Sequence, residues 1–159
     1  MRPRLLISAM LAGLSVLGSD LRAQPRQFAI AAIEAKLFYS NTGRFSTNVI
    51  GNPKFILHNV VAGEGSAEGP SESTLLVVRL QGPPKGFLKD LRLRVTATAE
   101  GDTLADHEFE VGGMNSAGNY YTACWLEDTG CQPIDVVAEL RGGKERKLVQ
   151  ANIPFNCAE

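Results

Sequence analysis

The segment covering residues 90–111 carries the clearest alternation of apolar and polar residues in the chain. From residue 91 to residue 99 the odd-numbered positions are Leu, Val or Ala, whereas the even-numbered positions are Arg or Thr. After the turn residues 100–102, Phe109 and Val111 continue the apolar parity. A period of two is typical of a strand with one face in the core. The segment therefore predicts a β-hairpin with one apolar face.

The parity of this hairpin also fixes its register. The apolar faces match only if paired residue numbers sum to an even value, which a three-residue loop centred on Gly101 satisfies. Arg94 then lies opposite Glu108, and Arg92 lies opposite Glu110. Such charges can form a binding surface, but exposed cross-strand pairs are common and weak, and we favour a solvated sheet face.

Other segments show strand patterns as well. Residues 75–80 form a dense run of apolar and β-branched residues, which predicts a central strand covered on both faces. Residues 33–39 favour a strand, with a short helix as the alternative. The remaining predicted strands cover residues 53–61, 119–126, 133–140 and 147–155. Short spacing, Gly and Pro turns and no long amphipathic helix predict an all-β fold, a single antiparallel β-sandwich of about seven or eight strands.

The first 23 residues have the layout of a secretory signal peptide. Arg2 and Arg4 precede an apolar run from Leu5 to Leu17, and a polar region then ends at Ala23. A buried N-terminal helix is the alternative. The apolar run is shorter than the ~20 residues that span a bilayer, and no later segment approaches that length. We expect a signal peptide at residues 1–23, one β-sandwich domain at residues 24–159, and a secreted or periplasmic location.

Charge limits the choice of partner for the mature chain. Removing the leader takes away three basic residues and one acidic residue from the 16 basic and 17 acidic residues of the full chain, which leaves a net charge of −3. Binding to nucleic acid or anionic lipid depends on clustered Lys and Arg. Because the chain has no basic block, we expect neither as a partner.

Three cysteines, Cys124, Cys131 and Cys157, raise the question of a disulfide. Pairing residues 133–140 with 147–155 so that their apolar faces meet requires paired numbers to sum to about 287, which puts Cys131 opposite Asn156 and beside Cys157. A bridge between Cys131 and Cys157 is therefore favoured, and it leaves Cys124 as a small buried apolar group. Bridges from Cys124 to Cys131 or from Cys124 to Cys157 remain alternatives.

The sequence offers few residues for catalysis. His58 and His107 are its only histidines, no Gly-x-Ser-x-Gly motif is present, and no Cys or His spacing fits zinc. We expect no catalytic residue, no metal site and no cofactor, and therefore no enzyme. A hydrolase whose site is assembled from distant residues is one alternative.

Two loops are candidates for recognition. The loop from Gly63 to Ser73 carries Glu64, Glu68 and Glu72, which supports a small-ligand or calcium-binding module as an alternative function. Its carboxylates recur every fourth residue, however, unlike the D-x-D-x-D-G spacing of calcium loops.

The second loop precedes residues 119–126. Its candidate recognition residues are Met114, Asn115, Tyr120 and Tyr121. Tyr and Asn are common at recognition surfaces. Alternatively, one tyrosine tucks its hydroxyl against a neighbouring turn.

Residues 52–78, together with "CWLEDTGCQPI" and "IPFNCAE", resemble secreted bacterial β-sandwich proteins, and the architecture resembles immunoglobulin-like or C2-like sandwiches. An architectural resemblance fixes neither chemistry nor ligand. We therefore predict a non-enzymatic secreted or periplasmic protein that binds another secreted protein or an envelope component through its loops.

Overall fold

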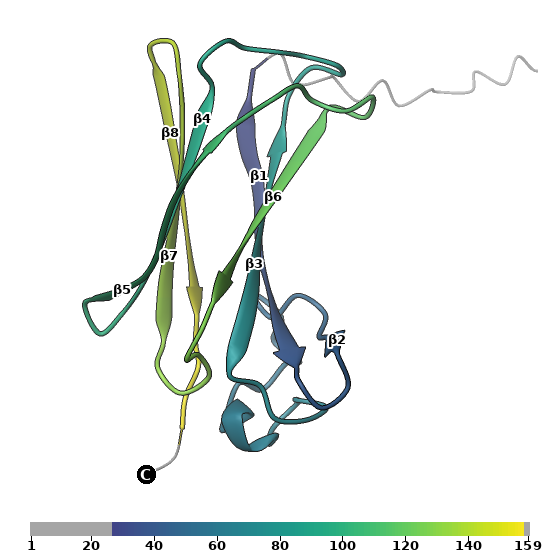
Figure 1. The fold of residues 1–159 in the computed structure, drawn as a ribbon, viewed down its shortest axis with the longest axis vertical. Coiled ribbons are helices and arrows are strands. Elements are labelled where there is room, and N and C mark those ends of the chain that lie inside the picture. The colour runs from purple at the N-terminus through teal and green to yellow at the C-terminus, as the bar shows by residue number, and fades with distance from the viewer. Residues whose placement is uncertain (1–26, 158–159) are drawn as a thin grey trace, which may run out of the picture.

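A computed structural model describes residues 27–157, and it is all-β, with eight strands in two antiparallel sheets. Sheet A has the order β2 (Arg44–Phe45), β1 (Ala29–Tyr39), β3 (Ser73–Gln81), β6 (Asn119–Leu126). Sheet B has the order β5 (Asp102–Glu110), β4 (Arg92–Ala99), β7 (Ile134–Gly142), β8 (Glu145–Ile153). The sheets form two layers that face each other, so the fold is sandwich-like (Figure 1).

The core fills the space between the layers. Alternate residues of each strand point inward, as in Leu76, Val78 and Leu80 of β3 and Leu93 and Val95 of β4, all at most 1% exposed. The inward residues of both sheets belong to one contiguous cluster. The period of two along the strands therefore separates a shared core from two outer faces.

The predicted pairing of the central hairpin is confirmed, because Arg94 lies opposite Glu108 and Arg92 opposite Glu110. The predicted three-residue loop is wrong. Glu100 and Gly101 both have positive φ, as in a two-residue hairpin turn, and a bulge next to Thr98 restores the apolar parity.

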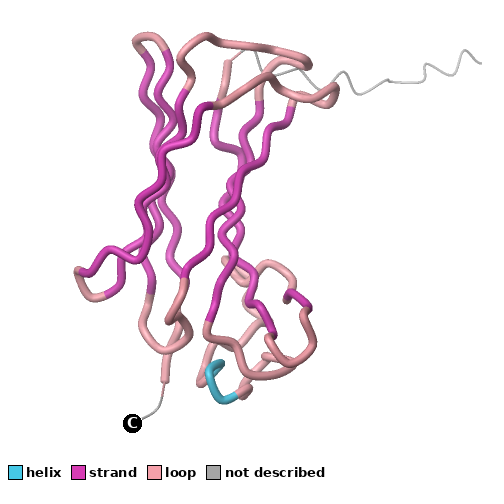
Figure 2. Tube along the Cα trace, in the orientation of Figure 1, coloured by secondary structure: helices cyan, strands magenta, loops and turns pink. Residues whose placement is uncertain are grey.

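The prediction of a strand over residues 53–61 is also wrong. This segment has one isolated bridge, from His58 to Asn156, and then a 3₁₀ helix, Val60–Ala62, the cyan element of Figure 2. Leu57 and Val60 are buried at this end of the sandwich. A segment that covers the end of a hydrophobic core can be as rich in apolar residues as a strand. The spacing of its apolar residues alone does not distinguish the two.

The segment 75–80 lies in β3, which is central in sheet A as predicted. Only one of its faces is fully covered, contrary to the prediction. Leu75, Val77 and Arg79, on the outer face, remain partly exposed. Both layers of the described chain are sheets, so the outer face of sheet A has no second layer over it.

The disulfide between Cys131 and Cys157 is confirmed, with the Cα atoms 4.6 Å apart. The predicted register of β7 and β8 is confirmed as well, since Val136 pairs with Ala151. Cys124 is free and buried, and burial raises the pKa of its thiol.

The predicted signal peptide lies outside the described residues. In residues 27–157 no helix has the length and apolar character required to cross a membrane.

Candidate functional site

The two predicted recognition loops lie at opposite ends of the sandwich. The loop from Gly63 to Ser73 follows the 3₁₀ helix at the lower end of Figure 1, whereas the connection between β5 and β6 crosses the upper end. They cannot form one continuous surface.

The three glutamates of the first loop make separate contacts. Glu64 accepts a hydrogen bond from the Asn59 amide (2.9 Å), and Glu68 pairs with Arg44. Glu72 is exposed, and its backbone carbonyl accepts a hydrogen bond from the Thr129 N–H. Within residues 27–157 no group of three His, Cys, Asp or Glu side chains is placed to hold a metal ion.

The second loop uses most of its predicted recognition residues for its own structure. Met114 is only 4% exposed and belongs to the core cluster, so its prediction as an exposed contact residue is wrong. The Asn115 side chain accepts hydrogen bonds from the backbone of Ala117 and Asn119 (both 2.9 Å), which shapes the turn. The Tyr120 hydroxyl donates to the Glu110 carbonyl at 3.3 Å, in agreement with the alternative considered for one tyrosine. Tyr121 points outward and is 55% exposed, and Asn115 is exposed as well.

An aromatic cluster on the outer face of sheet A is the most distinctive surface of the described chain. The ring centroids of Phe38 and Phe45 are 5.3 Å apart, those of Phe38 and Trp125 are 5.5 Å apart, and those of Phe45 and Trp125 are 5.8 Å apart. Phe45 is 43% exposed and Trp125 is 45% exposed. Three large rings contact one another while nearly half of two of them stays in solvent, so they form a partly exposed apolar surface.

Strand register explains how these rings meet. Phe38 pairs directly with Phe45 on one side and with Ser73 of β3 on the other. Trp125 of β6 pairs with Leu75, the residue two positions after Ser73. Because Ser73 is small, the rings from β1 and β2 can contact the ring from β6 over β3, and the diagonal distance is within reach of an aromatic side chain.

The aromatic surface is larger than these three rings. The same face of β3 and β6 carries Leu75, Val77, Tyr121 and Ala123. Together with Phe38, Phe45 and Trp125, these residues define what we call the aromatic surface.

Charged groups lie around the aromatic surface. Arg44 pairs with Glu68 next to Phe45. At the other side, Ser73 donates a hydrogen bond to Glu127 (2.9 Å). An apolar centre with a polar rim is the usual anatomy of a protein interface.

The outer face of sheet B has the opposite character. Arg94 forms two hydrogen bonds with Asp106 (2.7 and 2.6 Å), and Arg92 pairs with Glu108 (2.8 Å) and Glu110 (3.3 Å). Sheet B is therefore covered by charges that neutralise one another.

Glu139 is the centre of this charged face. Its side chain is 9% exposed and accepts two hydrogen bonds from Arg141 (2.7 and 2.8 Å) as well as an ion pair from Arg146. These guanidinium groups lower the pKa of Glu139 to about 2. The outer face of sheet B thus carries paired charges, whereas the outer face of sheet A carries the aromatic surface.

The aromatic surface was not among the features predicted from the sequence. A signal was present, because Phe38 and Trp125 occupy the outward parity of their strands, where polar residues are usual. Phe45 gave no such signal, since its two-residue strand is too short to show a period. No protein-family model matches this chain, and a search of curated proteins gave no match.

Proposed function

We propose that this protein is a non-enzymatic secreted or periplasmic binding domain that attaches to a partner protein through the aromatic surface of sheet A. The observation that carries the proposal is the contact of Phe38, Phe45 and Trp125 in solvent. Trp and Tyr are the residues most often responsible for binding energy at protein interfaces. The proposed binding site is therefore the outer face of sheet A and not the two loops predicted from the sequence.

The ring geometry favours a protein over a saccharide as the partner. Saccharide stacking uses a single open ring face, whereas Trp125 shares its contact area with Phe38 (interplanar angle 83°) and Phe45 (36°). Rings that contact one another form a compact apolar cluster. Such a cluster can pack against an apolar region of another protein.

Two further assignments belong to this proposal. The disulfide between Cys131 and Cys157 supports an oxidising, extracytoplasmic location, in agreement with the predicted leader. The strand order supports an immunoglobulin-like type, because β1-β3-β6 and β4-β7-β8 follow the A-B-E and C-F-G order, with β5 next to β4.

Site-directed photo-cross-linking in the producing cells tests the proposed function. A photoreactive phenylalanine analogue is placed at Phe45 and, as a control, at Leu148, which is 48% exposed on sheet B. We expect a discrete protein adduct from position 45 and none from position 148. The adduct should weaken about tenfold or more when Trp125 is changed to Ala, since truncating a central aromatic residue removes about 2 kcal/mol of binding energy.

Folding is checked separately, because a loss of adduct has meaning only for a folded variant. Trp125→Ala removes a side chain that is 45% exposed but contacts Phe38 and Phe45, so its Tm should fall moderately while the variant stays folded at the temperature of the experiment. Equal adducts from both positions would contradict the proposal. The proposal would also be contradicted if no protein adduct formed and the purified protein bound cell-wall polysaccharide in a way that required Trp125.

A further inference from the structure

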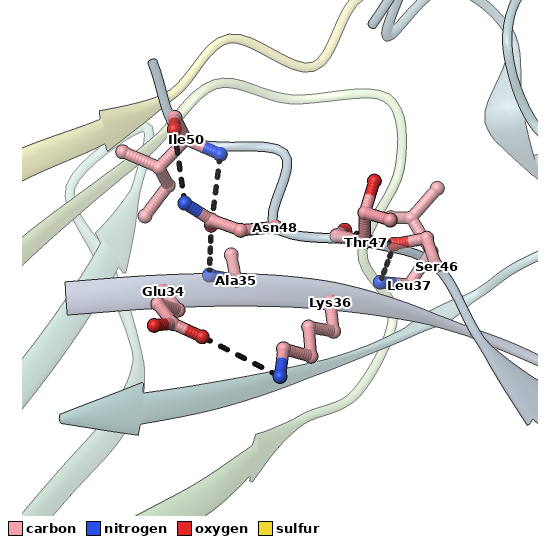
Figure 3. Close-up of polar contacts among 8 residues, drawn as sticks. All are labelled: Glu34, Ala35, Lys36, Leu37, Ser46, Thr47, Asn48 and Ile50. Carbon is pink, nitrogen blue, oxygen red and sulfur yellow. Dashed lines mark hydrogen bonds and ion pairs between the residues drawn. The ribbon is translucent and has the colours of Figure 1, made fainter. Parts of the chain in front are cut away.

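Sheet A has two edges, and the β1 edge is closed by its own chain. Figure 3 shows the segment after β2 running along β1. There the Ser46 hydroxyl accepts a hydrogen bond from the Leu37 N–H, and the Asn48 side chain accepts one from the Ala35 N–H, both at 2.9 Å. Ser46 and Asn48 thus occupy backbone groups that an added strand would need.

The edges of sheet B are protected by charge. The sequence of β5 includes Asp102, Asp106, Glu108 and Glu110, and β8 begins with Glu145, Arg146 and Lys147. Charged side chains on an edge strand oppose pairing with another strand.

The β6 edge of sheet A has no such protection. Its sequence, NYYTACWL, contains no charged residue, no proline and no glycine over eight positions. Within residues 27–157, the backbone of residues 120–126 forms hydrogen bonds only with β3. An uncharged edge of this length is a template for strand addition.

We propose that β6 pairs antiparallel with β6 of a second copy of this chain, so that two molecules join their sheets A into one continuous sheet. A two-fold axis at Ala123 keeps the outer faces on the same side, because paired residue numbers then sum to an even value. Tyr121 lies opposite Trp125 of the other copy in this register. Aromatic cross-strand pairs of this kind stabilise sheets.

The positions of Arg79 and Glu127 favour a second copy of this chain as the partner at the β6 edge. Arg79 lies on β3 beside Tyr121, is partly buried, and forms no ion pair with any residue in 27–157. Glu127 follows β6 at its other end. The two-fold arrangement brings Arg79 of each copy to about 12 Å, Cα to Cα, from Glu127 of the other, within the combined reach of both side chains. The β6 edge thus has a basic residue, Arg79, beside one end and an acidic residue, Glu127, at the other. In a two-fold dimer the basic end of each copy lies near the acidic end of the other.

The acidic residues of β5 do not oppose this association. Glu108 pairs directly with Arg94, and Asp106 is two positions before Glu108 on the same face of the strand. Both side chains therefore lie on the outer face of sheet B and point away from sheet A. Their charges are compensated by Arg92 and Arg94.

Sedimentation equilibrium of the purified mature protein over a range of concentrations tests the inference. We expect a reversible dimer. Arg79→Glu or Glu127→Arg alone should raise the dissociation constant about tenfold or more, since each puts two like-charged pairs into the dimer. An equimolar mixture of the two single variants should restore association, because both contacts of the mixed dimer then join opposite charges.

A second pair of variants addresses the backbone edge. Ala123→Lys places two lysines opposite each other at the two-fold axis and should abolish the dimer. Ala117→Lys, on an exposed loop, should leave it unchanged. A monomer at every concentration, or a dimer that is insensitive to both Ala123→Lys and the charge reversals, would overturn the inference. The experiment contains no partner protein, so its failure would leave the proposed function untouched.

Discussion

At the scale of single residues, Glu139 shows how a sheet surface can hold a nearly buried charge. A carboxylate with 9% of its side chain exposed is stable as an anion only when its oxygens have donors. Arg141 and Arg146 supply those donors, and their attraction outweighs the desolvation that would raise the pKa of the carboxyl group. The arginines in turn are held over the sheet, which keeps a charged layer on β4, β5, β7 and β8.

This arrangement predicts a pH-dependent stability. Folding lowers the pKa of Glu139 from its ordinary value of 4.5 to about 2, so the ionised group stabilises the fold above pH 4.5. The stabilisation is lost as pH falls through that interval. We expect Glu139→Gln to lower Tm at pH 7 and to reduce the dependence of Tm on pH between 4.5 and 2.

Thermal melts across this pH range check the prediction. Glu145→Gln is the matched control, because Glu145 pairs with Lys147 at 3.3 Å with 58% of its side chain exposed. An exposed pair contributes little to stability. A Glu139→Gln curve that parallels the wild type over the whole pH range would contradict the role assigned to Glu139.

At the scale of elements, the β7–β8 hairpin is joined to the preceding loop by the disulfide. Gly130, next to Cys131, has a φ of +122°, and a Cβ there would lie 2.9 Å from Val60 and from Val61. Glycine therefore lets the chain pass close to the 3₁₀ helix and bring Cys131 to Cys157.

Removal of the disulfide should destabilise the whole sandwich. The bridge closes a loop with a sequence separation of 26, for which the chain-entropy relation gives about 3.5 kcal/mol. A variant with Cys131→Ser and Cys157→Ser should melt roughly 10 °C lower or more. Cys124→Ser provides a comparison at a free, buried cysteine. An unchanged Tm in the double variant would show that the bridge does not stabilise the fold.

Strands whose residues alternate between apolar and polar could be predicted from the sequence. Segments whose structure depends on tertiary contacts could not. The alternation in β4 and in the β7–β8 hairpin was sufficient to give the registers, and the register gave the disulfide. Residues 53–61 look like a strand because Leu57 and Val60 are buried for a different reason, at the end of the core. β2 forms only because β1 is there to pair with it.

The aromatic surface illustrates the same limit. The alternation within each strand places Phe38 and Trp125 on the exposed face. Their contact, however, depends on β1, β3 and β6 being neighbours in that order, and the sequence does not give the strand order. Met114 is the reverse case, because a loop residue was expected to be exposed and the packing of the sheets buries it.

At the scale of the whole molecule, the two outer faces differ in kind. Sheet B carries charges that are paired with one another, and sheet A carries the aromatic surface beside an unprotected edge at β6. A sandwich needs only its inner faces to fold. The difference between the outer faces is therefore the property on which the proposed function depends.

Trp125 makes the central claim directly measurable, since it is the only tryptophan in the chain and lies within the aromatic surface. The measurement is its fluorescence emission during titration with the partner protein recovered from position 45. Burial of the exposed indole should shift the emission to shorter wavelength, saturably and with a dissociation constant that rises about tenfold or more in Phe45→Ala. Saturable binding that leaves the emission of Trp125 unchanged would contradict the account, because the partner would then bind elsewhere.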